Sequence, residues 1–170
     1  MVEAGHREAY DVVVVGGGPA GATAATALAR QGRSVLLLDR AGRIKPCGGA
    51  IPPRLIRDFE IPDHLLTARI TSARMVAPSG RAVDMPIEGG FVGMVDREHF
   101  DEWLRQRATQ AGAARQYGRF LELTRDDDAA ATVHFRVKGT PPDGPAHTVR
   151  ARAERMDRLG HKMLAIPLAT

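Results

Sequence analysis

The first forty residues alternate between apolar runs and short polar or glycine-rich breaks. The continuous apolar runs Val12–Val15 and Val35–Leu38 predict two strands, at 10–15 and 34–38, buried on both faces as in a parallel sheet. The alanine-rich residues 20–31 between them predict a slim helix, which Gly32 ends. Together these elements predict a right-handed βαβ unit of about 30 residues.

Patterns further along the chain predict smaller elements. Apolar residues at helical spacing predict a short helix at 53–59, and residues 70–87 are typical of two antiparallel strands joined by a two-residue turn, Ser79-Gly80. A helical pattern follows at 97–111. Asp96 precedes this pattern and is expected to cap the helix, because a carboxylate there accepts hydrogen bonds from its free amides.

The last third of the chain predicts an antiparallel β-meander. Val133, Phe135 and Val137 alternate with polar residues, which indicates one buried and one solvated face. The three expected strands are 120–124, 132–137 and 148–153. The fold class is therefore α/β, a Rossmann-like βαβ domain followed by a second small sheet and a β-meander.

A glycine loop, defined here as residues 16–21, joins the first strand to the first helix. Gly16 permits a sharp turn, Gly18 lets a pyrophosphate approach the backbone, and Gly21 lets the helix pack closely on the strand. Pro19 and Ala20 complete the loop. Phosphates are expected there, because free amides and the helix dipole favour negative charge at a helix N-terminus.

Asp39 ends the second predicted strand, 18 residues after Gly21. A carboxylate at this place accepts hydrogen bonds from ribose hydroxyls and repels a 2′-phosphate, so the spacing predicts an adenosine with a free ribose. The alternative is that Asp39 only caps a loop. Arg40 is expected to cover the adenine or contact a phosphate. The alternative interpretation is that its side chain only extends into solvent.

Composition restricts the partners and the compartment. The net charge is +4, but the arginines are scattered along the chain rather than clustered, which argues against nucleic-acid binding. Cys47 is the single cysteine, so no internal disulfide forms and a cytoplasmic location is expected. No metal-ligand spacing and no apolar run of about 18 residues occurs. The positive charge is compatible with a peripheral membrane contact.

Two further motifs make a family resemblance specific. They are Lys45-Pro46-Cys47-Gly48-Gly49 and Val95-Asp96-Arg97-Glu98-x-Phe100-Asp101-x-Trp103-Leu104. With the glycine loop and Asp39-Arg40, they resemble the geranylgeranyl reductase family over residues 10 to about 153, in particular its bacteriochlorophyll- and chlorophyll-pathway members. The Pro19 form of the loop is similar to the FAD loops of flavoprotein oxidoreductases. The resemblance implies an FAD enzyme that uses NADPH to saturate double bonds of a geranylgeranyl chain, either as the diphosphate or attached to bacteriochlorophyll.

The resemblance also implies roles for individual residues. Cys47, Gly48 and Gly49 would run beside the flavin, and Cys47 is the one catalytic candidate. The alternative interpretation is that Cys47 is only a small residue that packs in the fold. Arg97 would contact the pyrophosphate or ribityl part of FAD, and its alternative is a solvated first-turn arginine. No residue stands out as the proton donor.

The chain departs from the family pattern after the third meander strand. A Gly-Ala-Asp-Gly type motif that would bind the ribityl side of FAD is expected there, and residues 154–170 do not match it. We therefore expect an N-terminal FAD-binding region at 1–153, in which residues 70–95 form the start of a substrate-side sheet and residues 119–153 a β-meander, followed by a divergent tail at 154–170. Such a fragment is expected to be inactive alone. Alternatives are a flavin monooxygenase, an archaeal-type lipid reductase and a non-catalytic nucleotide-binding remnant.

Overall fold

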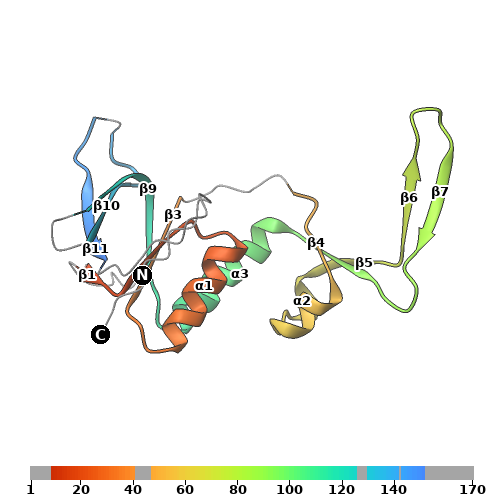
Figure 1. Ribbon diagram of the computed structural model, residues 1–170, viewed down its shortest axis with the longest axis horizontal. Coiled ribbons are helices and arrows are strands. Elements are labelled where there is room, and N and C mark those ends of the chain that lie inside the picture. The colour runs from red at the N-terminus through yellow and green to blue at the C-terminus, as the bar shows by residue number, and fades with distance from the viewer. Residues whose placement is uncertain (1–8, 41–46, 126–129, 142, 152–170) are drawn as a thin grey trace. The chain divides into compact units, whose positions relative to one another are not determined.

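The computed structural model describes residues 9–40, 47–125, 130–141 and 143–151, which form two units (Figure 1). The first unit combines the described residues up to Arg40 with those from Asp101 onward. The second contains the described residues from Cys47 to Phe100. Each unit has sheets of its own, and the predicted glycine loop and meander both belong to the first.

The first unit is built on a six-stranded sheet with the order β1-β11-β10-β9-β3-β2. Its strands are β1 (Ala9–Tyr10), β2 (Val12–Val15), β3 (Val35–Asp39), β9 (Ala114–Arg125), β10 (Ala131–Val137) and β11 (His147–Ala151). Strand β3 pairs in parallel with β2 and with the first part of β9. The remainder of β9 pairs antiparallel with β10, which pairs antiparallel with β11.

The predicted βαβ unit is present. Helix α1 (Pro19–Arg30) connects β2 to β3, with Gly18 as its N-cap and Pro19 at its first position, where proline's missing amide has no helical acceptor to bond. Gly32 follows the helix with φ +79°, a left-handed conformation that glycine adopts without a Cβ clash. Because β2 and β3 are buried along nearly their whole length, they read as continuous apolar runs in the sequence.

Strand β9 contains a third parallel segment that the sequence pattern did not predict. Leu36 pairs with Ala114 and Asp39 pairs with Tyr117, so β9 begins four residues after helix α3 (Arg97–Gln110) and extends the parallel sheet before it enters the meander. Residues 114–117 are only partly buried or exposed. They therefore lack the apolar run by which β2 and β3 were recognised.

Asp11 divides the single strand that was predicted at 10–15. Tyr10 pairs with Ala151 in β11, whereas Val12 pairs with Val35 in β3. The backbone amide of Asp11 donates to Ser34 Oγ at 2.8 Å, and the amide of Ser34 donates back to Asp11 Oδ2 at 2.7 Å. Strands β1 and β2, the first and last in the order of the sheet, are thus separated only by Asp11 in the sequence. The sheet therefore curls.

The meander supplies the second half of this core. Val133 and Phe135 are completely buried, as the alternating pattern predicted, whereas Val137 is only partly buried; Val149 of β11 is also buried. They cluster with apolar residues of β1, β2 and β3 on the inside of the curled sheet. Full burial of each such side chain stabilises the fold by roughly 1.5–3 kcal/mol. The predicted fold class is confirmed, with an additional parallel strand.

The second unit contains two small sheets and short helices. Its three-stranded sheet has the order β4-β8-β5, and a separate two-stranded sheet pairs β6 with β7. Residues 70–95 therefore contribute to two sheets. The elements are β4 (Ala50–Ile51), α2 (Pro53–Asp58), a 3-10 turn (Asp63–Leu65), β5 (Leu66–Ile70), β6 (Ser72–Val76), β7 (Ala82–Pro86) and β8 (Val92–Val95).

The β6–β7 hairpin has a longer turn than predicted. The amide of Ala77 donates to the carbonyl of Arg81 at 2.8 Å, which leaves a three-residue loop of Pro78, Ser79 and Gly80 instead of Ser79-Gly80 alone. Gly80 adopts φ +80°. Pro78 lies in the loop because proline has no amide hydrogen to donate to the neighbouring strand. A three-residue hairpin loop needs one residue in the left-handed conformation, and Gly80 takes that position.

Candidate functional site

The glycine loop turns where the sequence predicted. Gly16 has φ +106°, and its amide donates to the carbonyl of Leu38 at 2.8 Å. A Cβ on Gly21 would overlap the carbonyl oxygen of Gly16 and lie 3.3 Å from Val14 Cγ1. Both positions therefore require glycine for the fold, independently of any ligand.

The outer side of the loop is open and offers free amides. A Cβ on Gly18 would meet nothing within 4 Å. The amide of Ala22 donates to the carbonyl of Gly18, so the amides of Ala20 and Gly21 precede the first helical acceptor. The first turn of α1 contains no acidic residue. This arrangement favours an anion at the start of α1.

Gly17, to which the sequence pattern assigned no role, lies against the acid at the end of β3. A Cβ at this position would be 2.7 Å from Asp39 Oδ2 and 3.0 Å from Arg105 Cδ. A side chain at the middle glycine of the three would therefore displace Asp39 or Arg105, because both approach the loop backbone. Neither contact has a sequence motif that would have revealed it.

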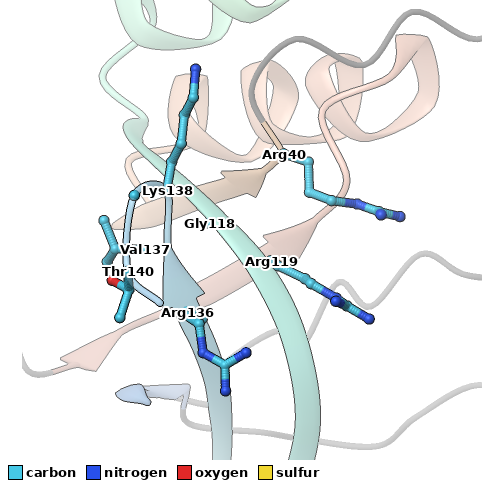
Figure 2. Close-up of a pocket in the computed structure, with 8 residues that line it drawn as sticks. Arg40, Gly118, Arg119, Arg136, Val137, Lys138 and Thr140 are labelled. Atoms are coloured by element: carbon cyan, nitrogen blue, oxygen red, sulfur yellow. The ribbon is translucent and has the colours of Figure 1, made fainter. Parts of the chain in front are cut away.

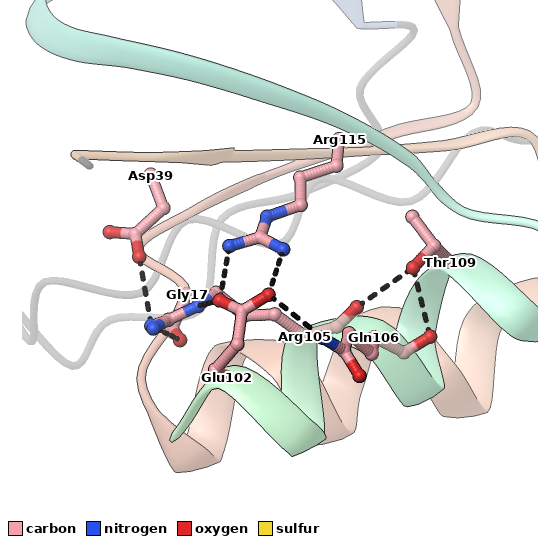
Figure 3. Close-up of polar contacts among 7 residues, drawn as sticks. All are labelled: Gly17, Asp39, Glu102, Arg105, Gln106, Thr109 and Arg115. Carbon is pink, nitrogen blue, oxygen red and sulfur yellow. Dashed lines mark hydrogen bonds and ion pairs between the residues drawn. The ribbon is translucent and has the colours of Figure 1, made fainter. Parts of the chain in front are cut away.

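Arg105 connects the glycine loop to Asp39 (Figure 3). Its Nη1 donates to the carbonyl oxygen of Gly17 at 2.9 Å and to Asp39 Oδ2 at 3.3 Å. The side chains of Arg105 and Asp39 are only 14% and 21% exposed. Among the described residues, Asp39 Oδ1 has no hydrogen-bond partner. The acid is therefore held by one oxygen while the other is available to a hydroxyl donor.

Glu102 and Arg115 support Arg105 from behind. Arg115 donates through both Nη atoms to the two oxygens of Glu102, each at 2.7 Å, and Arg105 Nε donates to Glu102 Oε2 at 3.1 Å (Figure 3). The forked contact from Arg115, reinforced by Arg105, lowers the pKa of Glu102 to about 2, although partial burial opposes the shift. Glu102 is therefore a carboxylate over the ordinary pH range.

These supporting residues were missed by sequence reasoning. Glu102 and Arg105 are three residues apart on α3, a spacing that brings side chains together on one helix face. That signal is common on solvated helices and does not indicate a site. Arg115 lies on the parallel part of β9, the segment that was not predicted, and its guanidinium packs over the Tyr117 ring at 4.6 Å.

The remaining predicted site residues occupy other places. Arg40 is exposed and lines a pocket with β9 and β10 (Figure 2). In the second unit, Cys47 and Gly48 are exposed, and Gly49 has φ +70°, with no room for a Cβ beside the carbonyl of Val95. Arg97 is the half-buried first residue of α3. Lys45 and Pro46 lie outside the described residues.

The start of α3 forms as predicted. Asp96 Oδ1 accepts a hydrogen bond from the amide of Glu98 at 2.8 Å, which confirms Asp96 as the cap. In the described part of the chain, no helix is long and apolar enough to cross a membrane. Within the same residues, no group of three or more His, Cys, Asp or Glu side chains is placed to hold a metal ion.

Comparison with known proteins shows which families this chain resembles. The profile of a family described as FAD dependent oxidoreductase matches residues 11–62, which include the glycine loop and Asp39. A geranylgeranyl diphosphate reductase of Rhodobacter capsulatus is 66% identical over 139 residues, which are 82% of this chain and 35% of that protein. Over these residues the chain is homologous to the geranylgeranyl reductases. The resemblance read from the motifs is confirmed.

Other relatives of this geranylgeranyl reductase homologue extend the comparison. Digeranylgeranylglycerophospholipid reductase 1 of Methanopyrus kandleri is 37% identical over 84% of the chain and 38% of that protein. The crystal structure of a geranylgeranyl bacteriochlorophyll reductase-like protein from Thermoplasma acidophilum superposes with a TM-score of 0.73 at 26% identity, covering 86% of this chain and 38% of the other. The chain thus spans about a third of the length of the curated relatives it matches.

Proposed function

We propose that this chain forms the adenosine side of the FAD site in a reductase that saturates double bonds of a geranylgeranyl chain. The observation that carries the proposal is the orientation of Asp39. Arg105 holds its Oδ2 against the glycine loop and leaves Oδ1 for a ribose hydroxyl. The 66% identity to a geranylgeranyl diphosphate reductase supports the choice of reaction.

The residues of the loop fit the diphosphate of FAD. The open space at Gly18 admits a phosphate, and the amides of Ala20 and Gly21 are free to donate to it. Pro19 fixes the first turn of the helix without adding a donor. Asp39 Oδ1 would accept from the ribose. A ribose 2′-phosphate at this place would be repelled by the carboxylate.

The flavin side is proposed from the second unit. Cys47, Gly48 and Gly49 would border the ring, with Cys47 the candidate for contact with the reacting part, and Arg97 would pair with the pyrophosphate or ribityl region. Bound FAD would supply hydride-transfer chemistry, with NADPH as the proposed electron donor. The protein residues would bind the cofactor, orient it and exclude water.

Two substrate classes follow from the relatives. The bacterial relative is a geranylgeranyl diphosphate reductase, which favours a free or pigment-attached geranylgeranyl chain. The Methanopyrus relative is a digeranylgeranylglycerophospholipid reductase at 37% identity, which makes an isoprenoid lipid the second candidate. A cytoplasmic location with a peripheral membrane contact is proposed, because both kinds of chain partition into membranes.

Calorimetric titration with ADP, FAD and 2′-phosphorylated ADP tests the cofactor assignment. ADP and FAD are expected to bind, and the 2′-phosphate is expected to weaken binding by about tenfold or more through repulsion by Asp39. An Asp39→Asn variant should lose this discrimination. Failure of FAD to bind, or equal binding of the 2′-phosphorylated nucleotide, contradicts the proposal. Mass spectrometry of geranylgeranyl diphosphate treated with the protein, FAD and NADPH tests the reaction. Unchanged substrate agrees with the expectation that this chain alone is inactive, two added hydrogens per double bond would show that it is an active reductase, and a hydroxylated product contradicts the proposed reaction.

A further inference from the structure

The β6–β7 hairpin of the second unit is a sheet of two strands only (Figure 1). Every residue from 71 to 86 is exposed. The exposed side chains include four large apolar ones, Met75 (60% exposed), Val76 (64%), Val83 (65%) and Met85 (44%). Single exposed apolar residues are common, but a contiguous set of them marks a surface that contacts another molecule or an apolar phase.

One face of the hairpin is entirely apolar. Met75 lies opposite Val83, and Ala73 lies opposite Met85, in the antiparallel register of the two strands. Residues that lie opposite each other project from the same face, so these four side chains form one continuous surface, the apolar face. Because all four are exposed, the rest of the described chain does not cover this face.

The opposite face is polar in the middle of the hairpin and apolar near the loop. Arg74 lies opposite Asp84 and donates to its two carboxylate oxygens, through Nε at 2.6 Å and through Nη2 at 2.8 Å. The next pair towards the loop is Val76 and Ala82. Beyond the ion pair, the hairpin is therefore apolar on both faces. A flat protein surface would cover one face only, whereas a lipid layer would surround both.

The hairpin end, defined here as residues 75–83, has few polar groups that need water. Arg81 is its single ionisable residue. The amide of Ala77 donates to the carbonyl of Arg81, and the amide of Gly80 donates to the carbonyl of Ala77, each at 2.8 Å. Pro78 has no amide hydrogen to donate. Internal pairing of backbone polar groups is what a lipid phase requires of a segment that enters it.

The size and charge of the hairpin end suit the headgroup region of a bilayer. At about 3.3 Å per residue, the strand residues beyond Arg74 extend about 10 Å, and interfacial elements enter a bilayer by about 5–10 Å. Each strand also has an outer edge, since the sheet has two strands, and such edges keep water or headgroups as partners only when insertion is shallow. The guanidinium of Arg81 would then meet lipid phosphates.

We propose that the hairpin end inserts into the surface of a membrane that contains anionic lipids. The inference rests on the proposed function, whose substrate carries an isoprenoid chain that partitions into membranes, and it names the surface that makes the peripheral contact. A second copy of the chain fits less well. The four side chains of the apolar face are too few for the roughly 1,200 Å² that a stable protein–protein interface buries, and Val76 on the other face would stay uncovered.

A fluorescent label on the loop tests the insertion. In a Cys47→Ser background, Ser79→Cys and Thr71→Cys each provide one thiol for an environment-sensitive dye, at the loop and at the base of the hairpin. On addition of vesicles that contain phosphatidylglycerol, the dye at position 79 should shift its emission to the blue, and the dye at position 71 should not. Vesicles of phosphatidylcholine alone should bind more weakly, because they lack the negative charge that attracts Arg81.

Substitutions in the hairpin end measure its contribution. Met75→Gln and Val83→Gln together should weaken vesicle binding in a flotation assay by about tenfold or more, because two apolar side chains no longer favour transfer into lipid. Both residues are exposed, so the fold does not depend on their packing. Leu55→Gln removes an apolar side chain of α2 that is 39% exposed and should leave vesicle binding unchanged.

ADP binding by the same preparations separates this inference from the proposed function. Failure to bind vesicles with ADP binding intact overturns the inference alone, whereas vesicle binding without ADP binding contradicts only the FAD site. Equal dye shifts at positions 71 and 79, or an equal loss in Leu55→Gln, also overturn insertion of the hairpin end. A blue shift without vesicles does so too, because a protein surface then covers the hairpin. A shift at raised protein concentration would identify a second copy, and a shift on co-production with the remaining two thirds of the Rhodobacter capsulatus relative would identify a further polypeptide layer.

Discussion

Arg105 Nη1 lies 3.3 Å from Asp39 Oδ2 and 2.9 Å from the carbonyl oxygen of Gly17. One guanidinium from α3 thus joins the acid at the end of β3 to the loop after β2. Replacing Arg105 with glutamine should release both, lower the free energy of unfolding by about 1–3 kcal/mol and weaken ADP binding by about tenfold. Urea unfolding and calorimetry measure the two effects.

A matched change on the same helix checks this prediction. Gln110→Ala alters an exposed residue at the end of α3 and should change neither the stability nor the ADP affinity appreciably. Arg105→Lys keeps the charge but lacks the fork that reaches two acceptors. Full ADP affinity in both Arg105 variants would show that Asp39 does not depend on this contact.

The contact between Glu102 and Arg115 predicts a pH dependence of stability. The pKa of Glu102 is about 2 in the folded protein against an ordinary value of 4.5, because Arg115 and then Arg105 donate to it. Between pH 4.5 and 2 the unfolded state binds the proton more readily, so stability falls as the pH falls through this range. The side chain is 37% exposed, and solvent screening reduces the contribution to about 1 kcal/mol.

Urea unfolding at pH 6 and pH 3 measures this contribution. Glu102→Gln cannot be ionised and should show a shallower loss of stability between the two values than the unchanged protein. Asp58→Asn is a suitable control, because Asp58 pairs with arginines only on the exposed surface of α2. Parallel pH curves for the unchanged protein and Glu102→Gln would contradict the assignment.

Two glycines of the loop, Gly17 and Gly18, should respond differently to substitution. Gly17→Ala would place a Cβ 2.7 Å from Asp39 Oδ2, so we expect it to lower stability by about 1–3 kcal/mol. Gly18→Ala enters open space at φ −74° and should leave the melting temperature nearly unchanged while weakening ADP binding. A thermal melt with a parallel ADP titration distinguishes the two. Equal effects of both variants would mean that Gly17 is not restricted by Asp39.

Cys47 provides a test of the flavin side. It is exposed and is the only cysteine in the chain, so a thiol reagent should label the native protein at one site. If Cys47 borders the flavin as proposed, FAD should slow labelling severalfold and ADP should not, because ADP lacks the ring. Equal protection by ADP and FAD would place Cys47 away from the flavin.

The continuous apolar runs of β2 and β3 were sufficient to predict the βαβ unit, because strands buried on both faces leave that pattern. The first part of β9 was missed because residues such as Arg115 face the polar network instead of the core. Asp11 interrupts an apolar run without a glycine or proline, so the division of the first strand had no local signal. It depends on pairing with Ser34 and β11, which are distant in sequence.

The candidate site was predictable where backbone conformation decides it. Gly16 and Gly21 are required by a turn and a close contact, and such positions leave glycines at fixed spacing. Arg105 and Glu102 act through side chains from a helix some 66 residues beyond Asp39, and their spacing is shared by many solvated helices. Contacts of this kind become visible only once the tertiary structure places the helix beside the loop.

The pairing of Tyr10 with Ala151 has a consequence for synthesis of the protein. As the chain leaves the ribosome, β2, α1 and β3 can assemble within the first forty residues. Strand β1, only two residues before β2, must wait until β11 has been made. A nascent chain can therefore form its glycine loop early, while the curled sheet stays unclosed until about 110 further residues have been made. Closure of that sheet is a late, long-range step, which contact order predicts to be slow.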